Sequence, residues 1–170
     1  SSKTLEPDSL TPIALDQRLV LNPVGDQLYL FLDSVLVDSL VFGAQLSDRS
    51  LGRLGPGAPW RVTRPTPGQA NTLAPTGNPR GVTINEWLAS RGTAFESDFI
   101  ELHNPSAWAV NVGGFSLTDN PLGQPDMYTL PAFTLIDADS TLVLIPDGST
   151  APGHLPFKLS AEGEILGLLD

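Results

Sequence analysis

The chain has 170 residues, a net charge of −10 and no cysteine. A chain of this length buries roughly 70% of the surface that its unfolded form exposes, so one domain is stable without disulfides. The missing cysteines exclude thiol catalysis, zinc sites with cysteine ligands and a disulfide scaffold.

Charge is unevenly distributed along the chain. Residues 1–80 carry seven basic and seven acidic side chains, whereas residues 81–170 carry two basic and twelve acidic ones. Proteins bind nucleic acid largely through Lys and Arg side chains, which displace counterions from the phosphates. Nucleic acid is therefore an unfavourable partner for the acidic second half of the chain. No run of 18 apolar residues occurs, and no membrane-spanning segment is predicted.

Sixteen Gly and sixteen Pro divide the whole chain into short pieces, a pattern typical of all-β proteins. Residues 1–18 are predicted to form a poorly ordered leader. "DQLYLFLD" (26–33) and "SVLVDSLVFG" (34–43) predict a hairpin with apolar residues on both faces. Arg53 and Trp60 are expected to stack as a cation–π pair. Residues 65–81 hold four Pro and three Gly, and they are expected to be a linker.

The second half continues with short strands. "INEWLAS" (84–90) lies between glycines and favours a strand over a helix. "DFIELHN" (98–104) alternates with a period of two, which places Glu101 and His103 on one face and Ile100 and Leu102 on the other. Gly113 and Gly114 indicate a bulge or bend, and "STLVLIPDG" (140–148) is a strand that ends at a turn.

A sequence repeat relates a segment near the N-terminus to the C-terminal segment. Residues 19–32, "LVLNPVGDQLYLFL", align without gaps with residues 157–170, "FKLSAEGEILGLLD", at an offset of 138 residues. Four aligned pairs are identical: Leu21/Leu159, Gly25/Gly163, Leu28/Leu166 and Leu30/Leu168. Self-similarity at the length of a domain predicts tandem domains, with a chain that begins inside one and ends inside the next.

Residues 82–170 resemble the front part of a lamin tail domain, the sandwich of nuclear lamins that also occurs in bacterial extracellular proteins. The resemblance is carried by "INEWLAS", "DFIELHNPSAWAVNVGGFSLTDNP", "TLPAFTLIDADSTLVLIPDG" and "FKLSAEGEILGLLD". Residues 25–71 resemble the back part of the same family, through "GDQLYLFLDSVLVDSLVFGAQLSDRSLGR", Trp60 and "TPGQAN". The order departs from the family pattern, because the back part here comes first.

The resemblance implies an all-β fold, an immunoglobulin-like β-sandwich. Residues 1–18 are assigned to the leader, 19–75 to the back part with the start of the linker, 76–81 to the linker and 82–170 to the front part. Segments 19–75 and 82–170 are expected to complete one sandwich. They do so either within one chain, as a circular permutant, or between chains by a domain swap.

Glu101 and His103 are the first candidates for metal ligands, together with Glu86 if the strands that carry them pair. A zinc or calcium site needs several such ligands around an open position. The alternative interpretation is the solvated face of an antiparallel strand, where polar residues alternate with apolar ones.

Acidic loops are the second candidates, with calcium as the cation. They offer Asp119 and Asp126 in one loop, and Asp137 and Asp139 in the next. Trp87 and Trp108 are candidates for a binding surface or for the core. No G-x-S-x-G motif and no phosphate-binding glycine loop occurs, so no catalytic residue is assigned and no cofactor is expected.

The resemblance implies a non-catalytic interaction or scaffolding module of a larger bacterial protein, extracellular or on the cell surface. Its expected partners are a protein or a cell-surface polymer, and self-association by strand exchange is a further expectation. Two other interpretations stay open. One is an accessory domain of an extracellular hydrolase, and the other is a metal-binding domain that uses Glu86, Glu101 and His103.

Overall fold

The computed structural model describes residues 9–14, 19–89 and 97–170. The chain divides into two compact units, one of residues up to Leu21 with Ser47–Pro75, the other of Asn22–Leu46 with Thr76–Asp170. Regular structure in the described residues is β-strand apart from one 3₁₀ turn, η1 (Pro79–Gly81), which confirms the all-β prediction. No helix in this part of the chain is long and apolar enough to cross a membrane. Most of the predicted leader 1–18, and Ser90, lie outside the described residues.

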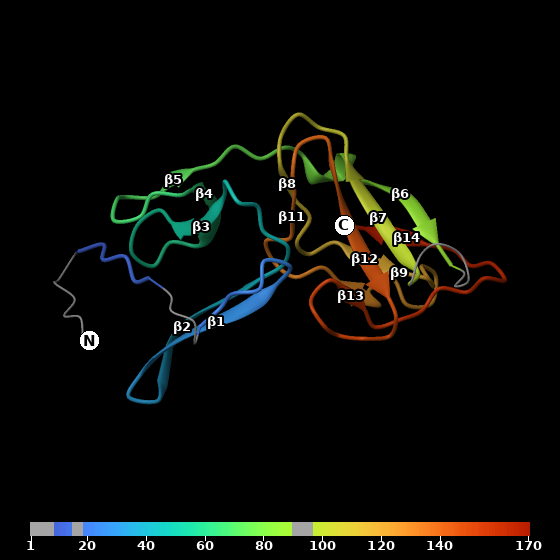
Figure 1. Ribbon diagram of the computed structural model, residues 1–170, viewed down its shortest axis with the longest axis horizontal. Helices are drawn as coiled ribbons and strands as arrows, with labels where there is room; N and C mark the ends of the chain where they lie inside the picture. The colour runs from blue at the N-terminus through green and yellow to red at the C-terminus, as the bar shows by residue number, and fades with distance from the viewer. Residues whose placement is uncertain (1–8, 15–18, 90–96) are drawn as a thin grey trace. The chain divides into compact units, whose positions relative to one another are not determined.

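The smaller unit contains one antiparallel sheet of three short strands (Figure 1). Its strands are β3 (Ser50–Arg53), β4 (Trp60–Arg64) and β5 (Thr72–Leu73), in the order β3-β4-β5. Thr63 is fully buried, and its hydroxyl lies 2.9 Å from the hydroxyl of Ser50 across the sheet. The guanidinium of Arg53 lies 4.5 Å from the ring centroid of Trp60, which confirms the predicted cation–π pair.

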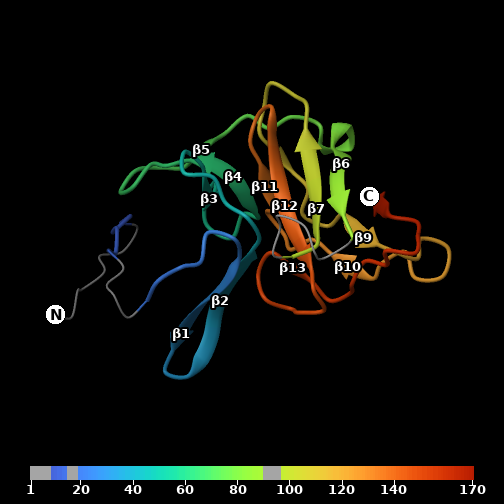
Figure 2. The ribbon, with the colours of Figure 1, turned by 45° about the vertical axis from the view of Figure 1, so that its right-hand side comes forward.

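A four-stranded sheet forms one layer of the larger unit. Its strands are β6 (Thr83–Leu88), β7 (Phe99–Asn104), β12 (Ser140–Pro146) and β13 (His154–Leu155), in the order β13-β12-β7-β6. Figures 1 and 2 both show β6, β7 and β12 side by side. Ile100, Leu102 and Asn104 are buried while Glu101 and His103 are half-buried, so the predicted alternation along β7 is confirmed.

The second layer is built from shorter pairings. β9 (Ser116–Thr118) lies between β10 (Tyr128–Thr129) and β14 (Gly167–Leu169), and β8 (Val110–Asn111) pairs with β11 (Leu135–Ile136). Side chains from both layers form one hydrophobic cluster, including Ile100, Leu102, Val110, Leu117, Ile136 and Leu144. A single core between two sets of strands makes this unit a β-sandwich.

The predicted hairpin is confirmed as β1 (Asp26–Leu32) and β2 (Val35–Phe42), paired antiparallel. Its two turn residues, Asp33 and Ser34, both have positive φ, as a type I′ turn requires. Backbone hydrogen bonds attach the chain after β2 to the sandwich: Gly43 donates to Ala132 O at 2.9 Å, and Leu135 donates to Ala44 O at 2.8 Å. The completion of one sandwich by residues 19–75 and 82–170 stays a prediction.

Candidate functional site

The polar face of β7 carries the first predicted site residues. The amide of Asn85 donates to Glu101 Oε1 at 2.7 Å, and His103 Nε2 lies 3.6 Å from Asp139 Oδ1. Glu86 stands opposite Glu101 in the β6–β7 pairing, next to an irregularity in the register. The structure therefore brings the two glutamates together, but it gives His103 a different neighbour.

The acidic loops lie at two places in the larger unit. Asp119 is half-buried directly after β9, and Asp126 is exposed at the far end of the same loop. Asp137 and Asp139 are both exposed before β12, and Asp137 Oδ1 accepts a hydrogen bond from the Ala138 amide at 2.8 Å. Within the described residues, no three His, Asp or Glu side chains gather in a way that could hold a metal ion. The metal and calcium hypotheses stay predictions.

Metal binding can be measured by thermal unfolding. A ligand present at 100 times its Kd stabilises a protein by about 2.7 kcal/mol, which raises Tm by roughly 5–10 °C in a chain of this size. We expect calcium, zinc and a chelator each to leave Tm unchanged, because Glu101 and His103 have separate polar neighbours. A rise in Tm that is lost in the His103→Ala or Glu101→Gln variant would contradict this expectation.

Two histidine–aspartate pairs are the remaining candidates for acid–base chemistry. His154 Nδ1 lies 2.9 Å from Asp147 Oδ2. The pKa of Asp147 is lowered mainly by the hydrogen bond from the backbone amide of Ser149, and to a smaller extent by the His154 imidazole. In the described part of the chain, no serine hydroxyl is hydrogen-bonded to either His103 or His154. Both pairs lie at the protein surface, where such side-chain interactions contribute little to stability.

The predicted binding residues Trp87 and Trp108 are both more than half exposed, at 56% and 54%. Trp87 belongs to β6, the edge strand of the four-stranded sheet, and Trp108 lies in the turn before β8. Neither residue belongs to the buried cluster of the sandwich. Both indole rings are therefore placed where a partner can reach them.

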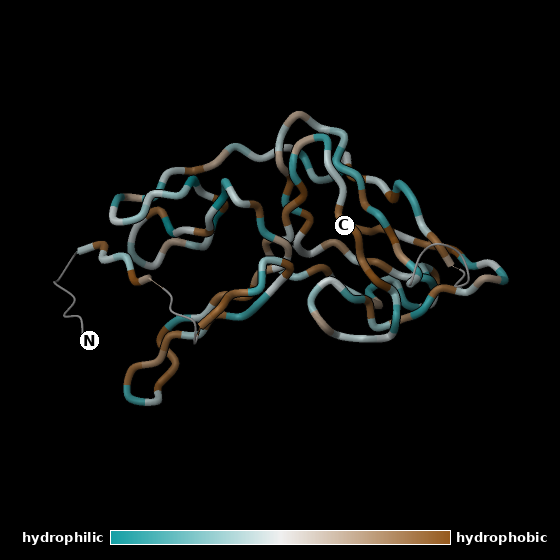
Figure 3. The backbone as a smooth tube through the Cα atoms, viewed as in Figure 1, coloured by the Kyte–Doolittle hydropathy of each residue, from teal (hydrophilic) through white to brown (hydrophobic). Residues whose placement is uncertain are grey.

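The β1–β2 hairpin carries the largest run of exposed apolar side chains in the described residues. The hydropathy colouring of Figure 3 shows hydrophobic residues along much of both of its strands. Their exposure ranges from 36% to 64%, at Leu28, Tyr29, Leu30, Phe31, Leu32, Val35, Leu36, Val37 and Val41. Exposed apolar patches of this kind mark interaction sites in soluble proteins. The apolar residues on both faces of segment 26–43 predict a hairpin, but by themselves they do not identify a binding site.

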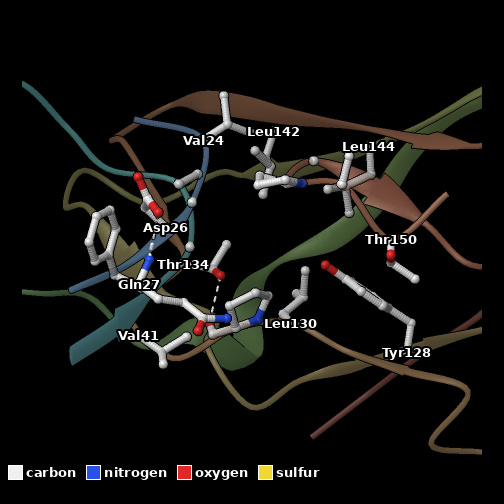
Figure 4. A pocket seen from close by; sticks show the side chains of 18 residues that line it. Val24, Asp26, Gln27, Val41, Tyr128, Leu130, Thr134, Leu142, Leu144 and Thr150 are labelled. Atoms are coloured by element: carbon white, nitrogen blue, oxygen red, sulfur yellow. Dashed lines mark hydrogen bonds between the residues drawn. The ribbon is translucent and has the colours of Figure 1, made fainter. Parts of the chain in front are cut away.

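A cavity of about 220 Å³ lies at the base of this hairpin, within the larger unit (Figure 4). Figure 4 shows Leu142 and Leu144 of β12 on one side and Tyr128 with Leu130 on the other. Burial raises the pKa of the Tyr128 phenol. Of the described residues that line the cavity, Asp26 is the one carboxylate, and backbone amides of Asn22 and then Gln27 lower its pKa. The cavity is suited to packing an apolar group.

A comparison with known protein families finds a match that covers most of the larger unit. The model of a family described as the Lamin Tail Domain matches residues 75–170, more than half of the chain. The match confirms the resemblance seen in residues 82–170, while the resemblance of residues 25–71 stays a prediction. No curated protein matches the chain, and neither does any solved structure.

Proposed function

The chain belongs to the lamin tail domain family, and from this premise we propose that it is a non-catalytic interaction or scaffolding module. The lamin tail domain is an immunoglobulin-like, protein-binding and non-enzymatic family. The match over residues 75–170 is the observation that carries the proposal. We further propose that the chain is part of a larger bacterial protein, secreted or on the cell surface, because the domain that it resembles also occurs in bacterial extracellular proteins.

The exposed hairpin supports binding as the activity. Leu30, Phe31 and Leu32 are each more than half exposed, and burying such side chains against a partner releases about 25 cal/mol per Å² of apolar surface. The net charge of −10 makes nucleic acid an unfavourable partner. A protein, or a cell-surface polymer, is the partner that this surface fits.

The proposal is tested by binding and turnover measurements on the full chain. We expect immobilised protein to bind a bacterial cell-envelope extract saturably, and protease treatment of the extract to remove the binding if the partner is a protein. Leu30→Asp is expected to weaken binding about tenfold or more, the loss of roughly 1.4 kcal/mol or more. Leu122→Asp is the matched control, because Leu122 is 93% exposed and lies in the loop after β9.

Measurements of substrate hydrolysis can contradict the proposal that the chain is non-catalytic. The proposal predicts no hydrolysis above a buffer blank on panels of ester, phosphoester and glycoside substrates. Hydrolysis that co-purifies with the protein and is lost in a His154→Ala or His103→Ala variant would show that the chain is an enzyme. Equal binding by wild type and Leu30→Asp would remove the hairpin from the binding surface.

A further inference from the structure

The β1–β2 hairpin has no cover on either face in the described structure. Leu28 and Leu30 point to one face, while Tyr29 and Phe31 point to the other, where their ring centroids lie 6.4 Å apart. A two-stranded hairpin is marginally stable in water by itself. The sheet order gives β1 and β2 no further strand neighbour. A partner that supplies a strand or an apolar surface would therefore stabilise it.

The sequence repeat between segments 19–32 and 157–170 is also a repeat in structure. Asn22 N donates to Asp26 Oδ2 at 3.0 Å, and at the aligned positions Ser160 N donates to Glu164 Oε1 at 3.0 Å. The aligned Val24 and Glu162 amides each donate to the side chain two residues before them. The aligned glycines at the turn, Gly25 and Gly163, both have positive φ. Both segments thus share these turn hydrogen bonds and lead into a strand, β1 from Asp26 and the shorter β14 from Gly167.

Each of the two equivalent strands has the neighbour that the other lacks. β14 pairs with β9, with Leu168 opposite Leu117, and it is the edge of the sheet β10-β9-β14. β1 pairs with β2, and it has no β9 beside it. A strand with the pattern of β1 and β14 is therefore compatible with β9 on one side and with β2 on the other.

We propose that two copies of this chain exchange their hairpins, so that β1 of one copy takes the place of β14 beside β9 of the other. The aligned register sets Leu30 opposite Leu117 and Phe31 opposite Ser116. Leu28 and Leu30 then replace Leu166 and Leu168, which are packed against the core, so that core composition at these positions is kept. The hairpin gains a third strand and a covered face, and a reciprocal exchange closes as a symmetric dimer.

The geometry at the hairpin base favours a second copy over the same chain. Gly43 and Ala44 are hydrogen-bonded to Ala132 and Leu135, and the cavity at this base is lined by Tyr128 of β10. β10 and β14 are opposite edges of the sheet β10-β9-β14. Within one chain, β1 would have to leave the β10 edge to reach the position of β14. The inference rests on the proposed interaction function and names its partner.

Single-cysteine variants test the exchange, because the chain has no cysteine of its own. A Phe31→Cys chain is mixed with a Ser116→Cys chain that carries a mass tag, and the mixture is oxidised gently. The register places these residues opposite each other, within the reach of a disulfide. Val41→Cys with Ser116→Cys is the matched control, because Val41 is also exposed but lies on β2, two strand spacings of about 4.8 Å from β9.

We expect the mixed disulfide of the Phe31→Cys pair to form in about tenfold higher yield than that of the control pair, as the proximity of opposed residues requires. Light scattering of the cysteine-free chain should show the mass doubling as concentration rises, and Leu30→Asp should prevent this while Leu122→Asp does not. Equal yields, or a monomer at every concentration, would overturn the exchange. A monomer that still binds an envelope protein through the hairpin would leave the proposed function standing, whereas a dimer with hydrolase activity would leave only the exchange.

Discussion

The Asn104→Ala variant is expected to lose about 2–4 kcal/mol of unfolding free energy, because several buried polar groups lose their hydrogen-bond partners. Asn104 is 1% exposed at the end of β7. Its amide nitrogen donates to Trp108 O at 2.8 Å, Asp137 O at 2.7 Å and Ile136 O at 3.3 Å. Its carbonyl oxygen accepts from the amide and the hydroxyl of Ser106. Urea unfolding followed by circular dichroism measures the loss.

An exposed asparagine gives the control for Asn104. Asn85 lies on β6 and makes its hydrogen bond to Glu101 at the surface, so Asn85→Ala is expected to change stability by less than about 0.5 kcal/mol. Asn104→Asp keeps the shape of the side chain but sets a carboxylate against three carbonyl oxygens. It should therefore be less stable at pH 7 than at pH 4, where protonation restores a donor. Equal losses for Asn104→Ala and Asn85→Ala would show that the Asn104 network does not hold the sandwich together.

Local patterns in the sequence predicted the elements that local chemistry decides. The alternation of segment 98–104 gave the buried and solvated faces of β7, because a strand in a sandwich has only two faces. The dipeptide Gly113-Gly114 marked the bend between β8 and β9. There Gly114 has φ +95°, and a Cβ on Gly113 would come within 2.5 Å of the Phe133 amide. Only glycine meets both demands.

Partners that come from distant parts of the chain could not be predicted in the same way. The pattern placed Asn104 on the inner face, but its acceptors Ile136 and Asp137 lie more than 30 residues further along. Its position in an acidic loop makes Asp139 a calcium candidate, whereas in the structure its Oδ1 lies 3.6 Å from His103 Nε2. Such contacts depend on which strands pair and in which register, and the register is set by the whole core.

The repeat between segments 19–32 and 157–170 also shows that the sequence does not predict strand pairing. The sequence identified segments 19–32 and 157–170 as equivalent, and the structure shows the same turn in both. The sequence alone does not predict which of the two strands pairs with β9, because the residue opposite Leu117 is a leucine in both cases, Leu30 or Leu168. Two equivalent strands with one place between them are the condition for exchange between copies.

Gly43 is the position where the hairpin depends most on close packing. Its amide donates to Ala132 O, and a Cβ added to it would lie 2.0 Å from Thr134 Oγ1 and 2.9 Å from Thr134 Cβ. Thr134 is buried and its hydroxyl donates to Pro131 O at 2.7 Å, so it has little freedom to move. Overpacking of this kind costs about 1–3 kcal/mol, which we expect for Gly43→Ala, with a larger loss for Gly43→Val.

Hydrogen exchange locates the damage that Gly43→Val is expected to cause. Amides of residues 43–45 and 132–135 should lose protection first, because the added side chain separates these two segments, while β7 and β12 keep theirs. Gly81→Ala is the control, since its added Cβ would meet no atom within 4 Å. Thr134→Ala should restore part of the stability of Gly43→Ala by removing the nearest clashing atom. If Gly43→Val were as stable and as well protected as Gly81→Ala, residues 43–45 would not be packed on the sandwich. The hairpin would then be connected to the sandwich only by a flexible segment.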